Sequence, residues 1–147
     1  MTAFENKYMR SAVEEARSAL SHGDIPVGAV IVRKNVIIAR AHNTREAENN
    51  PLGHAEINAV KKACDRLNNW RLDDCDLYVT LEPCLMCTGA IIESRLRRVY
   101  FGAYDTERGY IASNDALKPR IKFEYYCGIM EDECKAVLDE FFKDLRL

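Results

Sequence analysis

The chain has 147 residues, 48% of them hydrophobic and 30% charged, with a formal net charge of −2 at pH 7. These values fit one globular domain and exclude a disordered or fibrous chain. The first twenty residues lack the apolar core of a secretory signal, and no run approaches the roughly 20 apolar residues of a membrane span. We therefore expect a cytoplasmic protein without membrane contact, which could bind a polyanion only through a local basic patch.

Apolar spacing in the first third of the chain predicts a helix followed by a hairpin. Residues at helical intervals indicate a first helix over Phe4–Leu20. Two β-rich runs, Val27–Val32 and Val36–Ala39, flank a short polar turn and predict two paired strands. The polar stretch His42–Gly53 contains turn-forming residues and is predicted to be a loop.

The rest of the chain alternates helical and strand patterns. Helical spacing begins at His54 and is followed by a β-rich run. A further helix is predicted to begin at Pro83, since proline is favoured in the first turn of a helix. The other predicted elements are strands over Asp76–Leu81, Arg98–Ala103 and Ile121–Tyr126 and an amphipathic helix over Glu131–Leu145. This order predicts an α/β sandwich with a mixed sheet that helices cover on both faces.

Three residues form a set of potential zinc ligands: His54, Cys84 and Cys87. A catalytic zinc site uses three imidazole, thiolate or carboxylate ligands and keeps its fourth position for water. Two cysteines three apart at a helix start place both sulfurs on one face, where the helix N-terminus stabilises thiolates. We therefore expect one Zn²⁺ per chain and a water whose pKa the metal lowers to roughly 7.

Glu56 follows His54 by two residues, where a loop becomes a helix and the first side chains can converge on one ligand. A free carboxylate beside an activated water suits a general acid and base in hydrolytic deamination. Alone, Cys-x-x-Cys is also typical of a redox pair or a structural half-site, and His54 and Glu56 of a helix cap and a solvated charge. Together, His-x-Glu and Pro-Cys-x-x-Cys match the zinc deaminase signature.

The four cysteines outside this set are predicted to be reduced packing residues. A chain without a secretory signal does not suggest a disulfide framework, and a free cysteine behaves as a small hydrophobe. These residues are Cys64, Cys75, Cys127 and Cys134.

With these motifs the chain resembles the cytidine deaminase superfamily, and within it the bacterial tRNA adenosine deaminases. The resemblance covers nearly the whole chain and rests on Asp24–Val30, His42-Asn43, His54–Ile57, Val79–Cys87, Phe101–Asp105 and the helix with Phe141-Phe142. It implies a three-layer α/β/α domain over residues 1–147 with about five strands, and a homodimer. It also implies zinc-dependent hydrolysis of adenosine to inosine at the tRNA wobble position, with Glu56 as proton shuttle for a zinc-held hydroxide.

The same resemblance implies roles for three further residues. Asn43 would hydrogen-bond the flipped base, Val27 would wall its pocket, and Asp105 would lie near the sugar. Without the resemblance, Asn43 and Asp105 are also typical turn formers and Val27 a core residue.

Two features leave the substrate open. The segment after Asp105 is shorter than the family pattern, without its Gly-Ser and Asn-His pairs, and the net charge is slightly acidic. The following six residues form either a local basic surface or scattered solvated charges: Arg95, Arg97, Arg98, Lys118, Arg120 and Lys122. The alternative substrate is a free nucleobase or nucleoside, such as guanine, cytosine or a modified purine. A non-catalytic zinc module is the third reading, and Glu56 argues against it, because a structural site closes with a fourth protein ligand.

Overall fold

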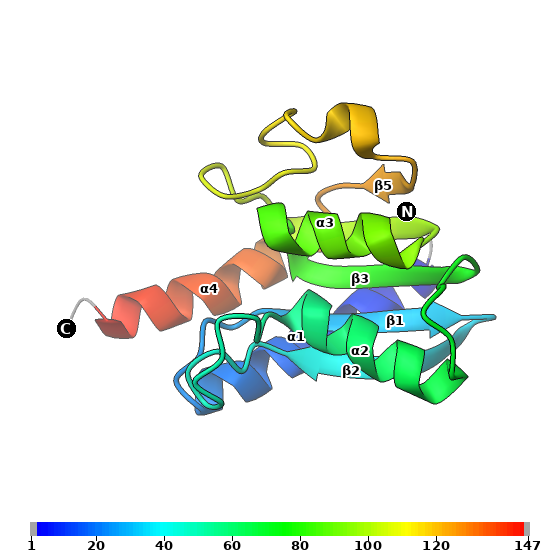
Figure 1. Cartoon of the computed structure of the whole chain (residues 1–147). Helices are drawn as coiled ribbons and strands as arrows, with labels where there is room; N and C mark the ends of the chain where they lie inside the picture. Colours follow the sequence, from blue (N-terminus) through cyan, green and yellow to red (C-terminus); the bar gives the residue numbers. More distant parts are fainter. Residues whose placement is uncertain (1–2, 146–147) are drawn as a thin grey trace.

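A mixed five-stranded sheet lies at the centre of the computed structural model, which describes residues 3–145 (Figure 1). The strands are β1 (Gly28–Arg33), β2 (Val36–His42), β3 (Cys75–Leu81), β4 (Arg98–Ala103) and β5 (Glu124–Tyr126). The helices are α1 (Ala3–Ser21), α2 (Ala55–Leu67), α3 (Leu85–Ser94) and α4 (Glu131–Leu145), with a short 3-10 helix at Lys118–Arg120. The strand order is β2-β1-β3-β4-β5.

The connections between strands explain why the sheet is mixed. β1 pairs antiparallel with β2 and with β3, whereas β3, β4 and β5 are parallel to one another. The β1–β2 hairpin turns at Lys34 and Asn35, whose φ angles of 50° and 63° match the mirror-image turn that suits the twist of paired strands. The parallel pair β3–β4 needs a crossover, and α3 provides it.

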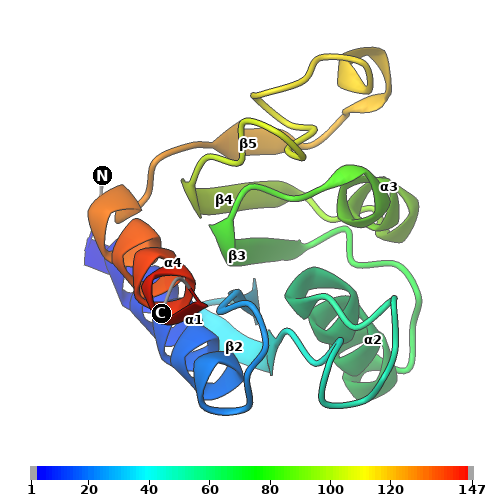
Figure 2. The ribbon, with the colours of Figure 1, turned by 90° about the vertical axis from the view of Figure 1, so that its left-hand side faces the viewer.

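Helices cover both faces of this sheet. Figure 2 shows α1 and α4 on one side of the strands and α2 and α3 on the other. Along β1, Ala29 and Ile31 belong to the core under α2 and α3, while Val30 and Val32 belong to the core under α1 and α4. Because strand side chains alternate between faces, a strand buried on both sides is a continuous apolar run. The predicted α/β sandwich with about five strands in a mixed sheet is confirmed.

Gly102 brings α4 close to the sheet. A Cβ at this position of β4 would overlap the Cys134 sulfur of α4 and would lie 3.0 Å from the Ile129 carbonyl oxygen. The absence of a side chain thus lets the helix rest on the strand. This contact helps to place the rest of α4, whose residues Lys135, Leu138 and Phe142 line a cavity at the ends of the strands.

Some predicted boundaries are wrong by a few residues. The helices predicted from His54 and Pro83 begin at Ala55 and Leu85, so that a cap residue precedes each of them. The last strand pairs only over Glu124–Tyr126, because its parallel register starts opposite Arg98, the first residue of β4. The side chain of Phe4, expected on the apolar face of α1, lies outside the described residues.

The four cysteines outside the candidate metal set pack in the two cores, as predicted. Cys75 and Cys134 are buried, Cys64 and Cys127 are partly buried against the first core, and all six thiols of the chain are free. Burial raises the pKa of Cys75 and of Cys134 to about 12, so neither thiol is reactive near neutral pH. Separately, within residues 3–145 every helix is too short or too polar to cross a membrane.

Candidate active site

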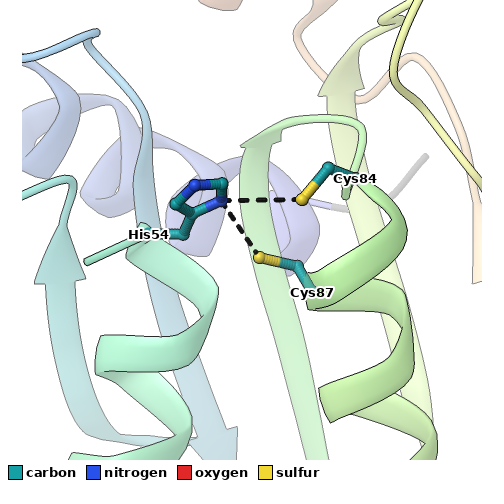
Figure 3. Close-up of side chains that lie close together, drawn as sticks. All are labelled: His54, Cys84 and Cys87. Carbon is teal, nitrogen blue, oxygen red and sulfur yellow. Dashed lines mark hydrogen bonds between the residues drawn. The ribbon is translucent and has the colours of Figure 1, made fainter. Parts of the chain in front are cut away.

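The starts of α2 and α3 lie side by side at one end of the sheet (Figure 3). His54 is the N-cap of α2, with φ −89° and ψ 148°, and Cys84 is the N-cap of α3, while Cys87 lies in the first turn of α3. The His54 side chain makes no cap hydrogen bond to its own helix, and the Cys84 sulfur contacts the Cys87 thiol in the first turn of α3. The three side chains therefore meet between the two helix starts. The positive end of α3 favours thiolates at this position.

The spacing of these three side chains fits a tetrahedral zinc ion. The His54 Nδ1 atom lies 3.6 Å from the Cys84 sulfur and 3.4 Å from the Cys87 sulfur. All three donor atoms lie within 4.8 Å of one another. Typical Zn–N and Zn–S distances with a tetrahedral angle place such a nitrogen and sulfur roughly 3.6 Å apart. The donor set therefore needs little rearrangement to hold zinc.

The ionisation of the two thiols also suits a metal site. The pKa of Cys84 falls to about 3, because the Cys87 thiol and the His54 ring hydrogen-bond its sulfur. The pKa of His54 is raised by the same contact with Cys84, and that of Cys87 is raised by its hydrogen bond to Cys84 and by burial. The low pKa favours the thiolate form of Cys84, which is the form that binds zinc, and an ion bound here would displace the proton that Cys84 shares with its neighbours.

Glu56 is a buried carboxylate in the first turn of α2, only 4% exposed. Burial raises its pKa to about 7, although hydrogen bonds from its own backbone N–H and from Cys87 act in the opposite direction. A carboxyl group that titrates near neutral pH can both accept and return a proton, which is the property a general acid and base requires.

A cavity of about 600 Å³ opens above this group of side chains. The predicted residues Val27, Asn43, His54, Glu56 and Asp105 all line it. Cys84 lines the cavity as well, whereas Cys87 is fully buried and does not line it. The structure therefore brings the predicted site residues together from five separate segments of the chain.

Asn43 and Val27 form one side of the cavity. The Asn43 Oδ1 atom accepts a hydrogen bond of 2.8 Å from the Ala55 N–H, the first residue of α2. Its Nδ2 amide has no hydrogen-bond partner among residues 3–145. Val27 is 5% exposed and belongs to the core, and it also lines the cavity, so it is both a core residue and part of the cavity surface. Asn43 likewise combines a structural bond with a free donor at the cavity.

Asp105 forms part of the opposite side and holds a turn. Its Oδ1 atom accepts hydrogen bonds from the backbone N–H groups of Glu107 and Arg108, at 3.3 and 3.0 Å. The residues that follow, Thr106, Glu107 and Arg108, also line the cavity there. Asp105 is thus a turn former that also faces the cavity.

Residues 2–103 match the family model described as the cytidine and deoxycytidylate deaminase zinc-binding region. The chain belongs to the cytidine and deoxycytidylate deaminase family. This deaminase is 44% identical over 143 residues to the tRNA-specific adenosine deaminase of Bacillus subtilis, and the alignment covers 95% of the chain and 89% of that relative. It is therefore a hydrolytic enzyme of a zinc-binding family, and the residues that can hold the ion are His54, Cys84 and Cys87.

Two solved structures of related enzymes match the fold of this deaminase. One is described as a tRNA:A34 deaminase that edits A to I at the wobble position; it is 40% identical, with a TM-score of 0.85, and the match covers 90% of the chain and 99% of that structure. The other is the guanine deaminase of Bacillus subtilis, 40% identical with a TM-score of 0.67 over 73% of the chain and 68% of that structure.

The basic residues considered in the sequence gather at the other end of the deaminase fold. Arg97 pairs with Asp76 at 3.0 Å and Arg98 with Glu124 at 2.8 Å, near the starts of β3 and β4, whereas the cavity lies at the ends of these strands. Four of the six residues line one hollow there: Arg95, Arg97, Arg120 and Lys122. The basic surface therefore forms in part, but it does not border the cavity.

Sequence reasoning missed several residues that line the cavity of this deaminase. They are Glu82, the charged residues Arg45 and Arg108, and the α4 residues Lys135, Leu138 and Phe142. The α4 residues follow Glu56 by more than seventy positions, and no spacing rule connects them with it. Glu82 stands next to Pro83 in a quoted motif, yet a glutamate is usually exposed, and nothing in its neighbours signals burial.

Proposed function

We propose that this enzyme deaminates adenosine to inosine at the wobble position of tRNA. The observation that carries the chemistry is the convergence of His54, Cys84 and Cys87 with the buried carboxyl group of Glu56 beside one cavity. The preference for tRNA is supported by relatives that are named for this reaction and align with almost the whole chain. A zinc deaminase acts on a base that has been extruded from its stack, which a cavity of this size accommodates.

In the proposed reaction water replaces the amino group on C6 of the adenine ring. His54, Cys84 and Cys87 would hold the zinc ion, which when bound would supply the Lewis acidity that activates water. Glu56 accepts a proton from the attacking water and passes it to the adjacent ring nitrogen. A C–O bond forms at C6. Glu56 then takes the remaining proton of the new hydroxyl group and gives it to the amino group, so that the C–N bond breaks, ammonia leaves and C6 becomes a carbonyl. Burial raises the pKa of Glu56 above its ordinary value, which suits a carboxyl group that both accepts and returns a proton.

The sides of the cavity orient the base in this proposal. The Asn43 Nδ2 amide donates to an acceptor nitrogen of the ring, since its Oδ1 atom is held by the Ala55 N–H. Val27 supplies an apolar surface against the ring, and Asp105 lies toward the sugar. Proteins recognise single-stranded RNA loops through unstacked bases and sugar hydroxyls. In this proposal Asn43 and Val27 contact the base, and Asp105 lies toward the sugar.

Asn43 offers a direct test of base binding. Asn43→Asp keeps the acceptor for the Ala55 N–H but removes the Nδ2 donor, so we expect the fold to survive while kcat/KM falls by about 10 to 100-fold. Asn43→Ala removes both groups and should also lower the melting temperature. Steady-state kinetics with thermal unfolding of both variants separates the two roles. Full activity in Asn43→Asp would refute a role in base binding.

The substrate is tested by offering the zinc-loaded enzyme a panel. We expect inosine at the wobble position of a tRNA whose anticodon begins with adenosine, and no ammonia from free purines, pyrimidines or nucleosides. Ammonia release with product identification by mass gives the answer. The likeness to a guanine deaminase is the observation that favours the second candidate, a free-base deaminase. Turnover of a free base with tRNA unchanged would establish that candidate.

We also propose that residues 1–147 form a single deaminase domain that works as a homodimer in the cytoplasm. Leu52 and Leu85, 55% and 52% exposed, lie within two residues of His54 and Cys84 in the chain, so exposed apolar side chains near the site could contact a second copy. The six free thiols are typical of a reducing compartment. A monomer in sedimentation experiments at micromolar concentration would contradict the dimer.

A further inference from the structure

Glu82 is a buried carboxylate that the proposed reaction does not use. It lies between β3 and α3 and is 2% exposed. Its Oε2 atom accepts hydrogen bonds from three consecutive backbone N–H groups, those of Ile111, Ala112 and Ser113, at 3.2, 2.8 and 2.8 Å. Its Oε1 atom accepts from the Asp105 N–H at 3.1 Å and from the Ser113 hydroxyl. Both oxygens of the carboxylate are therefore committed to one segment of the chain.

That segment, residues 105–113, forms a wall of the catalytic cavity; we call it the 105–113 wall. Asp105, Glu107 and Arg108 face the cavity from it, and the segment has no regular secondary structure of its own. Gly109 sits directly against the Glu82 carboxylate, where any Cβ would overlap the carboxylate atoms. The wall is thus wrapped around Glu82 and contacts it from both ends and from the middle.

A neutral side chain cannot replace this carboxylate. Four backbone N–H groups and a hydroxyl point at one position, and only an ionised carboxylate offers two acceptor atoms with no donor. Hydrogen bonds to a charged acceptor are stronger than neutral ones, and buried N–H groups left without a partner are costly. The position of the wall therefore depends on the charge of Glu82 and not only on its volume.

The location of Glu82 connects the wall with the metal ligands. Glu82 precedes Cys84 by two residues, and the Tyr110 N–H donates to the carbonyl oxygen of Pro83 at 3.0 Å. Cys84 and Gly109 also form an isolated antiparallel bridge. The segment that carries a metal ligand is thus the same segment that anchors the wall.

We propose that Glu82 is a positioning residue that holds the 105–113 wall against the catalytic cavity and so sets where Asp105, Glu107 and Arg108 meet the substrate. The proposal rests on the proposed function, since these three residues act on a substrate only if the cavity binds one. Within the described part of the chain, every side-chain hydrogen bond of Glu82 goes to the wall, so its effect on the substrate passes through the wall.

The first test measures hydrogen exchange of the wall amides in the zinc-loaded enzyme, without substrate. Glu82→Gln keeps the size of the side chain but turns one terminal acceptor into a donor. We expect the amides of residues 105–113 to exchange at least about tenfold faster in this variant, since a hydrogen bond to a charged acceptor corresponds to roughly that factor. Gly109→Ala disturbs the same contact from the wall side, and it should give the same pattern if Glu82→Gln fails to fold.

The matched control is Asp76→Asn. Asp76 is also a buried carboxylate of the same strand region, but it lies at the other end of β3, where it pairs with Arg97. This variant can lower stability, yet the wall amides should keep their exchange rates. Faster exchange of the wall in Asp76→Asn to the same extent would show a general loss of stability and would overturn the proposal.

The second readout is steady-state kinetics on the substrate that the panel above identifies. Wall contacts hold substrate equally in the ground state and in the transition state, so Glu82→Gln should raise KM by about tenfold and change kcat by less than about threefold. One zinc per chain should remain. Unchanged exchange and unchanged KM in Glu82→Gln would refute the role of Glu82, whereas a wild-type enzyme that leaves tRNA unmodified would refute only the proposed substrate.

Discussion

Replacing Glu56 with glutamine is expected to abolish ammonia release while zinc remains bound. Glutamine fills the same buried space at the start of α2 but cannot accept or return a proton. General acid and base catalysis contributes about 10²–10⁴-fold to a rate, and Glu56 is proposed to serve two proton transfers, so kcat should fall by at least about 10³-fold. The measurement is single-turnover ammonia release together with the zinc content of the purified variant.

The outcome for Glu56 is interpretable because a matched control exists on the same helix. Asp65 is an exposed carboxylate near the far end of α2, and Asp65→Asn should retain wild-type turnover. Glu56→Ala should lose as much activity as Glu56→Gln, since what matters is the missing proton carrier. If Glu56→Gln turned over at the wild-type rate, the proton-shuttle role would be refuted, and loss of zinc would instead indicate a structural role.

Replacing Cys87 with alanine is expected to remove zinc and activity together. Cys87 is fully buried, its sulfur lies 3.4 Å from the His54 Nδ1 atom, and alanine offers no donor atom in its place. Two remaining ligands are too few for a stable zinc site. The zinc content should fall well below one ion per chain, and activity should fall with it. Elemental analysis and ammonia release measure both.

Zinc binding should also stabilise the fold, and this effect provides a second readout. A ligand at 100 times its Kd stabilises by about 2.7 kcal/mol, which for a chain of this size corresponds to a rise in Tm of roughly 5–10 °C. A chelator should remove this increment from the wild type and have no effect on Cys87→Ala. Cys75→Ala, a buried thiol away from the cavity, should lose packing stability but keep its zinc. One bound zinc per chain in Cys87→Ala would exclude Cys87 as a ligand.

The sequence predicted the metal set because its residues depend on local structure. His54 and Glu56 belong to one helix start, and Cys84 and Cys87 to another, so that spacing alone places each pair on one turn. The fold class was predicted for a similar reason, since the period of apolar residues distinguishes strands from helices. The predicted ends of helices were less accurate. His54 and Cys84 are N-caps with an extended backbone, and this conformation depends on the residues packed around them and not on their own spacing.

Only the tertiary structure decided how distant segments meet at the cavity. Nothing in the sequence around Asn43 indicates that its Oδ1 atom is held by Ala55, and nothing near Glu82 identifies the 105–113 wall as its partner. The course of α4 past the cavity depends on the close contact between Gly102 and Cys134. Local spacing determines which side chains share a turn or a strand face. Contacts between distant segments depend on the packing of all the helices and strands together, and a local pattern of residues does not specify that packing.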